Sequence, residues 1–396
     1  MSLFQSEFWT ILCNLVLAIE LVIYIIYAWP VLKRNFSNHH PFRYNLALSM
    51  SALGVFALLL VLGACLPAIF DPILYYPYNY YAVFGFFAWL LFAVLHIKGL
   101  EAYARWKARK QGLNPNDIQI SGEILYASFQ KYRAEHPESL QYDIEFQRKL
   151  VHVLSILFLL PFLIGPTLYY YVYTYVYASY PELYSSAILH NLFVASSLSP
   201  LSIAIFSNSQ TILVALLIAV DIQVVGELFH NRAPDRFYPL RKAFLKCLRE
   251  EEKGSFGSHV SMTTGYLICT LILAYNIPAP LFNASSNAII ATVLATIFGD
   301  MAASGVGRRW GKRKWTFNAK KSHLGTEAGI IVTFLVTFPF IGFLGSTVAV
   351  VFFVLTDVVL AKYRISDNFA FPILTALLLR LVLPYLSLPL VIWNLL

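Results

Sequence analysis

The sequence predicts an all-α protein, a polytopic transmembrane helical bundle with about 10–12 spans. Of its 396 residues, 58% are hydrophobic and only 13% are charged, which leaves too little polar surface for a soluble globule of this length. Apolar runs of about 20 residues, enough to cross a bilayer as a helix, recur along the chain. The alternating segments of about ten residues that are typical of transmembrane strands do not occur.

Eleven apolar stretches are candidate spans. The first has no basic residue before it and no small-residue cleavage site after it, which predicts a retained span and not a removed signal peptide. The stretches lie near residues 8–31, 44–69, 80–98, 150–176, 186–206, 211–230, 259–280, 286–306, 328–344, 346–361 and 370–395.

The positive charge is concentrated in a few loops. Of 29 Lys and Arg, 28 fall in five loops, and only Arg380 lies inside a span. This asymmetry is the positive-inside pattern, so it predicts that the five loops share the cytoplasmic face, and it argues against nucleic acid as the partner. The basic loops are 31–43, 98–149, 232–253, 308–321 and 362–364, whereas the connections around 70–79, 177–185, 207–210 and 279–285 carry no Lys or Arg.

The number of crossings in the middle of the chain conflicts with this pattern. Three predicted spans, 150–176, 186–206 and 211–230, separate two basic loops that should share a side, and three is an odd number. Either residues 148–206 contain an additional crossing or one segment is re-entrant. The charge asymmetry is the stronger signal of the two.

The chain divides at about residue 145. Residues 1–145 contain three spans and a cytoplasmic linker of mixed charge, which includes "GLNPND". Residues 146–396 contain the other spans and all the polar clusters that resemble a chemical site, so they are predicted to form a catalytic transmembrane domain.

A glycine-rich segment at 299–327 carries the main candidate site. On a helix, Asp300, Ala303, Ser304 and Gly307 share one face. Small residues allow either close helix packing or close approach of a ligand, and packing is the commoner use. A carboxylate in a span costs about 2.5–3.5 kcal/mol at the bilayer centre, so Asp300 is a functional candidate by default.

A dense positive strip follows this acid. Cations and exposed backbone amides bind phosphate, and a neighbouring carboxylate suits the Mg²⁺ of a nucleotide triphosphate. The basic run by itself would indicate contact with anionic lipid, but acid, glycines and paired lysines together predict a magnesium–nucleotide site that is not a Walker loop. The strip comprises Arg308, Arg309, Lys312, Arg313, Lys314, Lys320 and Lys321, interspersed with Gly305, Gly307, Gly311 and Gly325.

Three other clusters are expected on the same face. "RKLVH" contains Arg148, Lys149 and His152, of which the two cations also suit snorkelling anchors. "LREEEKGSFGSHVSMTTG" contains Glu252, either a solvated acid or a second metal ligand or base, and His259. "KYRISDNFAFP" contains Asp367 and Asn368, which form either an Asx turn with a helix cap or a metal or ribose contact.

Four other acids lie inside spans. Glu20 has no evident partner in the sequence, and Asp221 and Glu227 suit either a buried ion-pair network or a site. Asp357 stands eleven residues before Asn368 and is expected to face the same side.

The segment "GDMAASGVGRRWGKRKWTFNAKKSHLGT" resembles the signature of the CTP-dependent polyprenol kinase family, which includes dolichol, phytol and farnesol kinases and CTP-dependent diacylglycerol kinase. The dolichol kinase branch is the most similar, because Trp315, "LRKAFLKCLREEEKG" and "SHVSMTTG" also resemble it. The resemblance covers about 145–385, and Asp357 stands where relatives usually carry Glu. The shared pattern, GDxxAS and then KK[ST]xxGT, is matched by Gly299, Asp300, Ala303, Ser304, Gly307, Lys320, Lys321, Ser322, Gly325 and Thr326.

The resemblance implies transfer of the γ-phosphoryl group of CTP, with Mg²⁺, to the terminal hydroxyl of a membrane isoprenoid alcohol such as dolichol. The membrane would be the endoplasmic reticulum in a eukaryote and the plasma membrane in a prokaryote. Asp300 and Glu252 would bind the metal, and His152, Glu252 and Asp367 are alternative general bases. His259 and Asp357 would bind the substrate. The implied nucleotide contacts are Gly299, Ser304, Gly307, Arg308, Lys320, Lys321, Ser322, Gly325, Thr326, Arg148, Lys149 and Asn368.

Two other classes of function stay open at this point. In the first class CTP is still the nucleotide substrate, but the enzyme either phosphorylates a different acceptor (diacylglycerol, phytol or farnesol) or is a cytidylyltransferase. CDP as the nucleotide product indicates a kinase, and pyrophosphate indicates a cytidylyltransferase. An anion or lipid-phosphate transporter would use the same charges as a pathway, although no internal repeat is visible.

Overall fold

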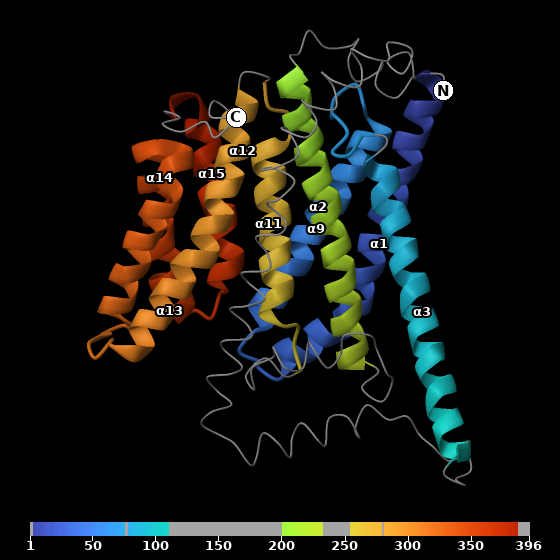
Figure 1. Ribbon diagram of the computed structural model, residues 1–396, viewed down its shortest axis with the longest axis horizontal. Coiled ribbons are helices and arrows are strands. Elements are labelled where there is room, and N and C mark those ends of the chain that lie inside the picture. Colours follow the sequence, from blue (N-terminus) through green and yellow to red (C-terminus); the bar gives the residue numbers. More distant parts are fainter. Residues whose placement is uncertain (1–2, 76–77, 111–199, 233–253, 279–280, 387–396) are drawn as a thin grey trace.

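The computed structural model describes residues 3–75, 78–110, 200–232, 254–278 and 281–386. Within these ranges the protein is a bundle of long helices that lie side by side (Figure 1). The helices are α1 (Leu3–Ser37), α2 (Arg43–Cys65), α3 (Tyr78–Lys110), α9 (Pro200–Arg232), α11 (Ser258–Ala274), α12 (Phe282–Leu294), α13 (Asp300–Arg309), α14 (His323–Val354) and α15 (Asp367–Val382). The shorter elements are η5 (Ala295–Gly299), β1 (Lys314–Trp315), β2 (Asn318–Ser322), η6 (Leu355–Leu360) and η7 (Leu383–Tyr385).

The predicted all-α membrane fold is confirmed. The described residues include seven helices that are long and apolar enough to cross a bilayer, and α11 is a shorter apolar helix. The predicted stretches 150–176 and most of 186–206 lie outside the described residues. The seven candidate spans are Glu7–Ser37, Arg43–Cys65, Tyr78–Leu95, Ser209–Leu228, Ala284–Arg309, His323–Leu360 and Asp367–Tyr385.

The span His323–Leu360 is two crossings. Its 38 residues would extend about 57 Å as one straight helix, nearly twice the hydrocarbon thickness of about 30 Å. The backbone is non-helical at Gly342, with φ 63° and ψ −169°, a conformation that is nearly restricted to glycine. Beyond this point the chain returns, because Phe353 packs against Gly329. The two stretches predicted at 328–344 and 346–361 are therefore both present.

The connection predicted at 207–210 is wrong, because these residues lie within the single helix α9. Gln210 bonds the segment between α2 and α3, as its Nε2 donates to the carbonyl oxygen of Ile73 at 3.1 Å. At the other end of α9, Asn231 accepts a hydrogen bond from Arg34 at the end of α1. The helix thus runs from one end of the bundle to the other, and the polar residues around 207–210 do not break it.

The described basic loops lie at one end of the bundle. Arg34, in the last turn of α1, bonds the carbonyl of Gly254, and Lys321 of the 308–321 segment contacts Asp367 beside residues 362–364. The end of α3 points the same way (Figure 1). This common end, the basic end hereafter, agrees with the predicted sharing of one face.

The helices on both sides of residue 145 share one hydrophobic core. Leu53 and Phe56 of α2 belong to the same cluster as Leu216 of α9, Leu267 of α11 and Leu379 of α15, and all five are at most 1% exposed. The predicted boundary at residue 145 stays a prediction. The packing nevertheless brings the N-terminal helices against the elements that carry the candidate site.

Candidate functional site

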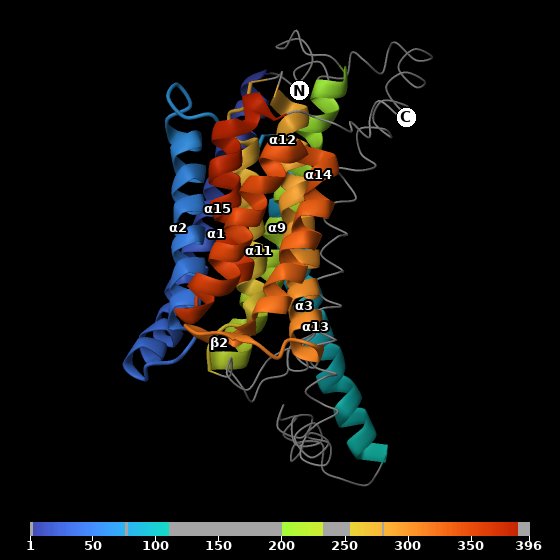
Figure 2. The ribbon, with the colours of Figure 1, turned by 90° about the vertical axis from the view of Figure 1, so that its left-hand side faces the viewer.

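Four segments meet at the basic end of the bundle: the η5–α13 junction, β2, η6 and the first turn of α15. Two of the acids inside spans are associated with π-helical turns, because η5 ends at Gly299 just before Asp300, and η6 contains Asp357. A π-helical turn adds a residue to the helix and displaces the side chains, and such turns are frequent at functional sites. Figure 2 shows β2 beneath the helix ends, between α13 and α15.

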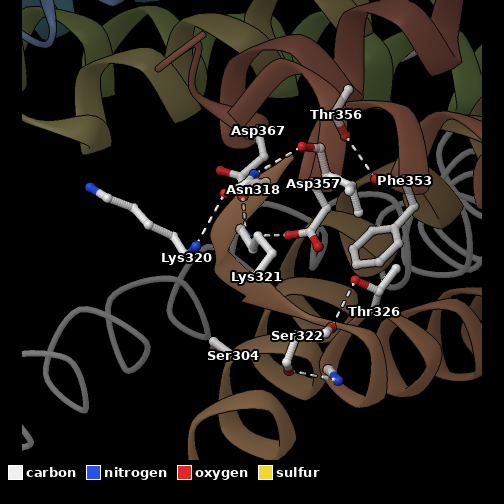
Figure 3. A network of polar contacts seen from close by, with 12 residues as sticks. Ser304, Asn318, Lys320, Lys321, Ser322, Thr326, Phe353, Thr356, Asp357 and Asp367 are labelled. Carbon is white, nitrogen blue, oxygen red and sulfur yellow. Dashed lines mark hydrogen bonds and ion pairs between the residues drawn. The ribbon is translucent and has the colours of Figure 1, made fainter. Parts of the chain in front are cut away.

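Lys321 is the centre of a polar cluster. Its Nζ donates a short hydrogen bond to Oδ1 of Asp357 and lies 3.6 Å from Oδ2 of Asp367 (Figure 3). The carboxylate of Asp300 is close enough to Lys321 to contribute to raising the pKa of that lysine. The structure therefore brings together four residues that the sequence singled out, from positions up to 67 apart (Asp300 to Asp367).

The electrostatics of this cluster are set by its acids. Burial alone would lower the pKa of Lys321, but the carboxylates of Asp367, Asp357 and Asp300 outweigh it and raise that pKa above its usual range. Three carboxylates and one ammonium carry a formal charge of −2. A negative cluster attracts a divalent cation and repels a phosphate that arrives without one.

The β1–β2 hairpin holds Lys321 in this position. Asn318, at the start of β2, donates from Nδ2 to the carbonyl oxygen of Val358 in η6 at 2.9 Å, and its side chain is buried. Trp315 donates from Nε1 to Oγ1 of Thr326 at 3.1 Å. Because side chains alternate along a strand, Lys321 points into the cluster, whereas Lys320 is exposed and points away (Figure 3). The contact of Asn318 was not predicted from the sequence.

Several predicted nucleotide ligands make local bonds. Ser322 caps α14, since its Oγ accepts from the backbone N–H of Gly325 at 3.1 Å. The same hydroxyl donates to the carbonyl oxygen of Gly307 at 3.4 Å, and Thr326 donates to the carbonyl oxygen of Ser322 at 3.2 Å. Ser304 donates to the carbonyl oxygen of Met301. Their contacts with a nucleotide stay a prediction, and the structure adds a capping and anchoring role.

The glycine face of α13 packs against α14. A Cβ at Gly325 would lie 2.6 Å from the carbonyl oxygen of Ala303 and 2.9 Å from Cα of Gly307. A Cβ at Gly299 would lie 2.4 Å from Oγ1 of Thr333. Of the two uses open to small residues, close helix packing is therefore what this face shows.

Replacing Gly325 by Ala is expected to lower the free energy of unfolding by about 1–3 kcal/mol, because overpacking forces α13 and α14 apart. The matched control is Gly305→Ala, because a Cβ at Gly305 meets no atom within 4 Å. That variant should be neutral or stabilising by up to about 1 kcal/mol through helix propensity. Thermal unfolding in detergent measures both variants, and equal stability for them would contradict the packing role.

His259 lies in a separate polar network at the same end. Its Nε2 is 3.2 Å from Oε1 of Glu227, whose side chain is 1% exposed. Oε1 of Glu227 also accepts from the backbone N–H of Gly257 at 2.9 Å, and its Oε2 accepts from Asn231 at 3.2 Å. Of the two readings for Glu227, the structure favours the buried network. Its contact with His259 was not predicted, because 32 residues separate the two.

Glu20, which had no evident partner in the sequence, accepts a hydrogen bond from Tyr24 Oη at 2.7 Å and also bonds Asp221 of α9.

Asn368 is 5% exposed, and its backbone N–H donates to Oδ1 of Asp367 at 2.9 Å. The predicted site residues Arg148, Lys149, His152 and Glu252 lie outside the described residues, so their roles stay predictions.

The carboxylates around Lys321 are of the kind that binds a divalent cation. Among the described residues, no three His, Cys, Asp or Glu side chains are placed to hold a metal by themselves. Mg²⁺ in nucleotide sites takes only one or two carboxylates, with phosphate and water as its other ligands. Oδ2 of Asp357 is buried without a hydrogen-bond partner, and Asp300 is near enough to influence that carboxyl. These two acids would supply the protein ligands.

Comparison with family models, with curated proteins and with solved structures found no match for this chain.

Proposed function

We propose that this chain is a CTP-dependent polyprenol kinase, which transfers the γ-phosphoryl group of CTP to the terminal hydroxyl of a membrane isoprenoid alcohol, with dolichol as the favoured acceptor. The observation that carries the proposal is the contact of Lys321 with Asp357 and Asp367, beside Asp300, at the basic end of a membrane bundle. These acids and this lysine belong to the segments whose motifs resemble the polyprenol kinase family.

The chemistry of phosphoryl transfer suits this arrangement. The reaction needs positioning and charge neutralisation more than covalent participation by the protein. When Mg²⁺ is bound, it would neutralise charge on the phosphate oxygens and on the acids Asp300 and Asp357 that hold it. Lys321 keeps the carboxylates in place, and the exposed Lys320 and Arg308 face the solvent from which a nucleotide arrives.

Asp367 is the preferred general base. Asp367 belongs to the cluster, and His152 and Glu252, which lie outside the described residues, stay alternatives. Its side chain is 26% exposed, compared with 2% for Asp357, so it is the more accessible acid for a substrate hydroxyl. A base must reach within hydrogen-bonding distance of the proton that it accepts, and accessibility is the first condition for that.

The acceptor would reach the cluster from the bilayer. Ile331, Leu335 and Phe338 on the first half of α14 are exposed apolar side chains, as expected for a lipid-facing surface. The site at the basic end would lie at the cytoplasmic rim of the endoplasmic reticulum membrane, or of the plasma membrane in a prokaryote.

The proposal is tested with purified protein, Mg²⁺ and either γ-labelled CTP or γ-labelled ATP. The acceptors are dolichol, polyprenol, geranylgeraniol and diacylglycerol in separate reactions. The expected result is label on dolichol or polyprenol with CTP as the better donor and CDP as the product. Label only on diacylglycerol, release of pyrophosphate, or no transfer to any of these alcohols would overturn the proposal, and the last result would favour a transporter.

A further inference from the structure

A buried asparagine on α2 bonds the segment that precedes Asp367. Asn45 is 4% exposed, and its Oδ1 accepts a hydrogen bond of 2.7 Å from the backbone N–H of Ser366. The two residues are 321 positions apart. A helix from the region that matched no motif therefore contacts the chain one residue before a member of the Lys321 cluster.

Ser366 determines where α15 begins. It is the N-cap residue of that helix, and its carbonyl oxygen accepts hydrogen bonds from the backbone N–H groups of Phe369 and Ala370 at 3.1 and 3.0 Å. Asn45 holds the other side of the same residue through its N–H. Because hydrogen bonds hold both the carbonyl oxygen and the N–H of Ser366, the side chain of the next residue, Asp367, is directed toward Lys321.

The segment before Ser366 needs such a restraint. Arg364 has φ 60°, a left-handed conformation that costs a non-glycine residue about 1–3 kcal/mol and persists where the surrounding structure holds it. Tyr363 and Arg364 donate to the carbonyl oxygens of Leu360 and Ala361, so a tight turn joins η6 to α15. This turn links Asp357 to Asp367, and Asn45 bonds its last residue.

The helix α2 is itself firmly placed. Oγ of Ser49, one turn after Asn45, lies 3.2 Å from Oγ of Ser261 on α11, and both side chains are buried. The neighbouring helix α1 contributes Asn35, whose Nδ2 donates to Oγ of Ser255 at 2.9 Å. The α1–α2 pair is thus fixed to the bundle near both His259 and Asp367.

We infer that Asn45 is a positioning residue, which orients Asp367 toward Lys321 by holding the N–H of Ser366. The α1–α2 pair is then part of the working site, and not only an N-terminal membrane anchor. The catalytic consequence rests on the proposed function, but the positioning itself does not. When Asn45 is truncated, the backbone N–H of Ser366 loses its hydrogen-bond acceptor. The effect should therefore be local to the start of α15.

Three variants test the inference by hydrogen–deuterium exchange and by steady-state kinetics of the full chain in detergent. In Asn45→Ala, the amides of Phe369 and Ala370 should exchange about fivefold faster, the effect of one lost hydrogen bond. In the same variant kcat should fall about tenfold, with KM for CTP within about twofold, because misplacement affects the reacting groups more than binding. Asn45→Asp keeps the acceptor and should restore both values. Ser51→Ala, the matched control on the exposed face of α2, should leave both near wild type.

Ser366→Pro removes the backbone N–H that donates to Asn45 and leaves Asn45 itself unchanged. The φ of Ser366 is −64°, which proline adopts, and the serine side chain makes no capping hydrogen bond, so α15 can still begin at this residue while the hydrogen bond to Asn45 is lost. It should reproduce the faster exchange and the lower kcat of Asn45→Ala.

Wild-type exchange at Phe369 and Ala370 in either Asn45→Ala or Ser366→Pro would overturn the inference, as would an equal change in Ser51→Ala. If the wild-type chain phosphorylates no alcohol, the proposed function fails, and the exchange measurement alone then decides whether Asn45 positions the start of α15.

Discussion

Replacing Asp300 by Asn is expected to lower turnover on the order of 10³-fold or more while the protein still inserts and folds. The substitution keeps the shape of the side chain and removes its charge, so a divalent cation loses an anionic ligand. Folding should change little, because Asn has the shape of Asp, and Asp300 is a half-buried residue inside the continuous helix Ala284–Arg309, where a neutral amide costs no more to place than a carboxylate. Initial rates with CTP and polyprenol, together with thermal unfolding, measure the two effects.

Glu327→Gln is the matched control for this experiment. Glu327 is the next acid along the chain and is exposed, so its substitution should leave both the rate and the unfolding temperature close to wild type. Full activity of the Asp300 variant would show that the metal assignment is wrong. Mg²⁺ titration adds a second readout, since a lost ligand should raise the Mg²⁺ concentration that gives half-maximal rate.

Lys321→Ala is expected to lower the free energy of unfolding by about 3–5 kcal/mol, because it leaves the buried acid Asp357 without its ion partner. The variant should also weaken CTP binding, which a rise in KM for CTP would detect. Asp357→Asn in the same chain should recover part of the lost stability, since a neutral amide is cheaper to bury than an uncompensated charge. The double-mutant cycle isolates the coupling between the two side chains.

The neighbouring Lys320 provides the control, because it is exposed on the opposite side of β2. Lys320→Ala should change stability by less than about 0.5 kcal/mol. Equal unfolding temperatures for the Lys320 and Lys321 variants would contradict the buried ion pair.

The pH dependence of this ion pair follows from the raised pKa of Lys321. A lysine whose pKa is raised by folding contributes stability fully below its unfolded pKa of about 10.4, and loses that contribution as the pH rises through the higher folded value. The stability difference between wild type and Lys321→Ala should therefore stay constant from about pH 8 to pH 9.5 and shrink only above about pH 10.4. The unfolding temperatures of both proteins, measured from about pH 8 to above about pH 10.4, give this stability difference. A difference that already declines at about pH 8–9 would contradict a raised pKa of Lys321.

Much of the membrane fold could be predicted from the sequence because the signal is local. A run of about 20 apolar residues must be a helix in a bilayer, where every backbone polar group needs an internal partner. The paired stretches at 328–344 and 346–361 were recognised for this reason, and Gly342 supplies the turn between them. The polar residues around 207–210 led to the wrong prediction of a connection between two spans. The single helix α9 tolerates these residues, because Gln210 bonds the segment between α2 and α3.

The candidate site could be predicted only in part. Asp300, Lys321, Asp357 and Asp367 were each identified as polar residues near or within apolar spans. The sequence could not show that Lys321 is the partner of Asp357, since the pairing depends on a chain reversal at Gly342 and on a strand held by Asn318. It also could not assign Ala303, Gly307 and Gly325 to helix packing or to a ligand, because small residues allow both.

The sequence by itself determined that the chain is helical and that it has many apolar segments long enough to cross a membrane, and it predicted that the positive loops share one face. These properties depend on the local cost of placing polar groups in hydrocarbon, which each segment carries in its own composition. The tertiary structure alone decided which acids surround Lys321 and that Asn45 of the second helix bonds Ser366. Such contacts join residues far apart in the chain, and they are determined by how packed helices place their ends, which no local pattern records.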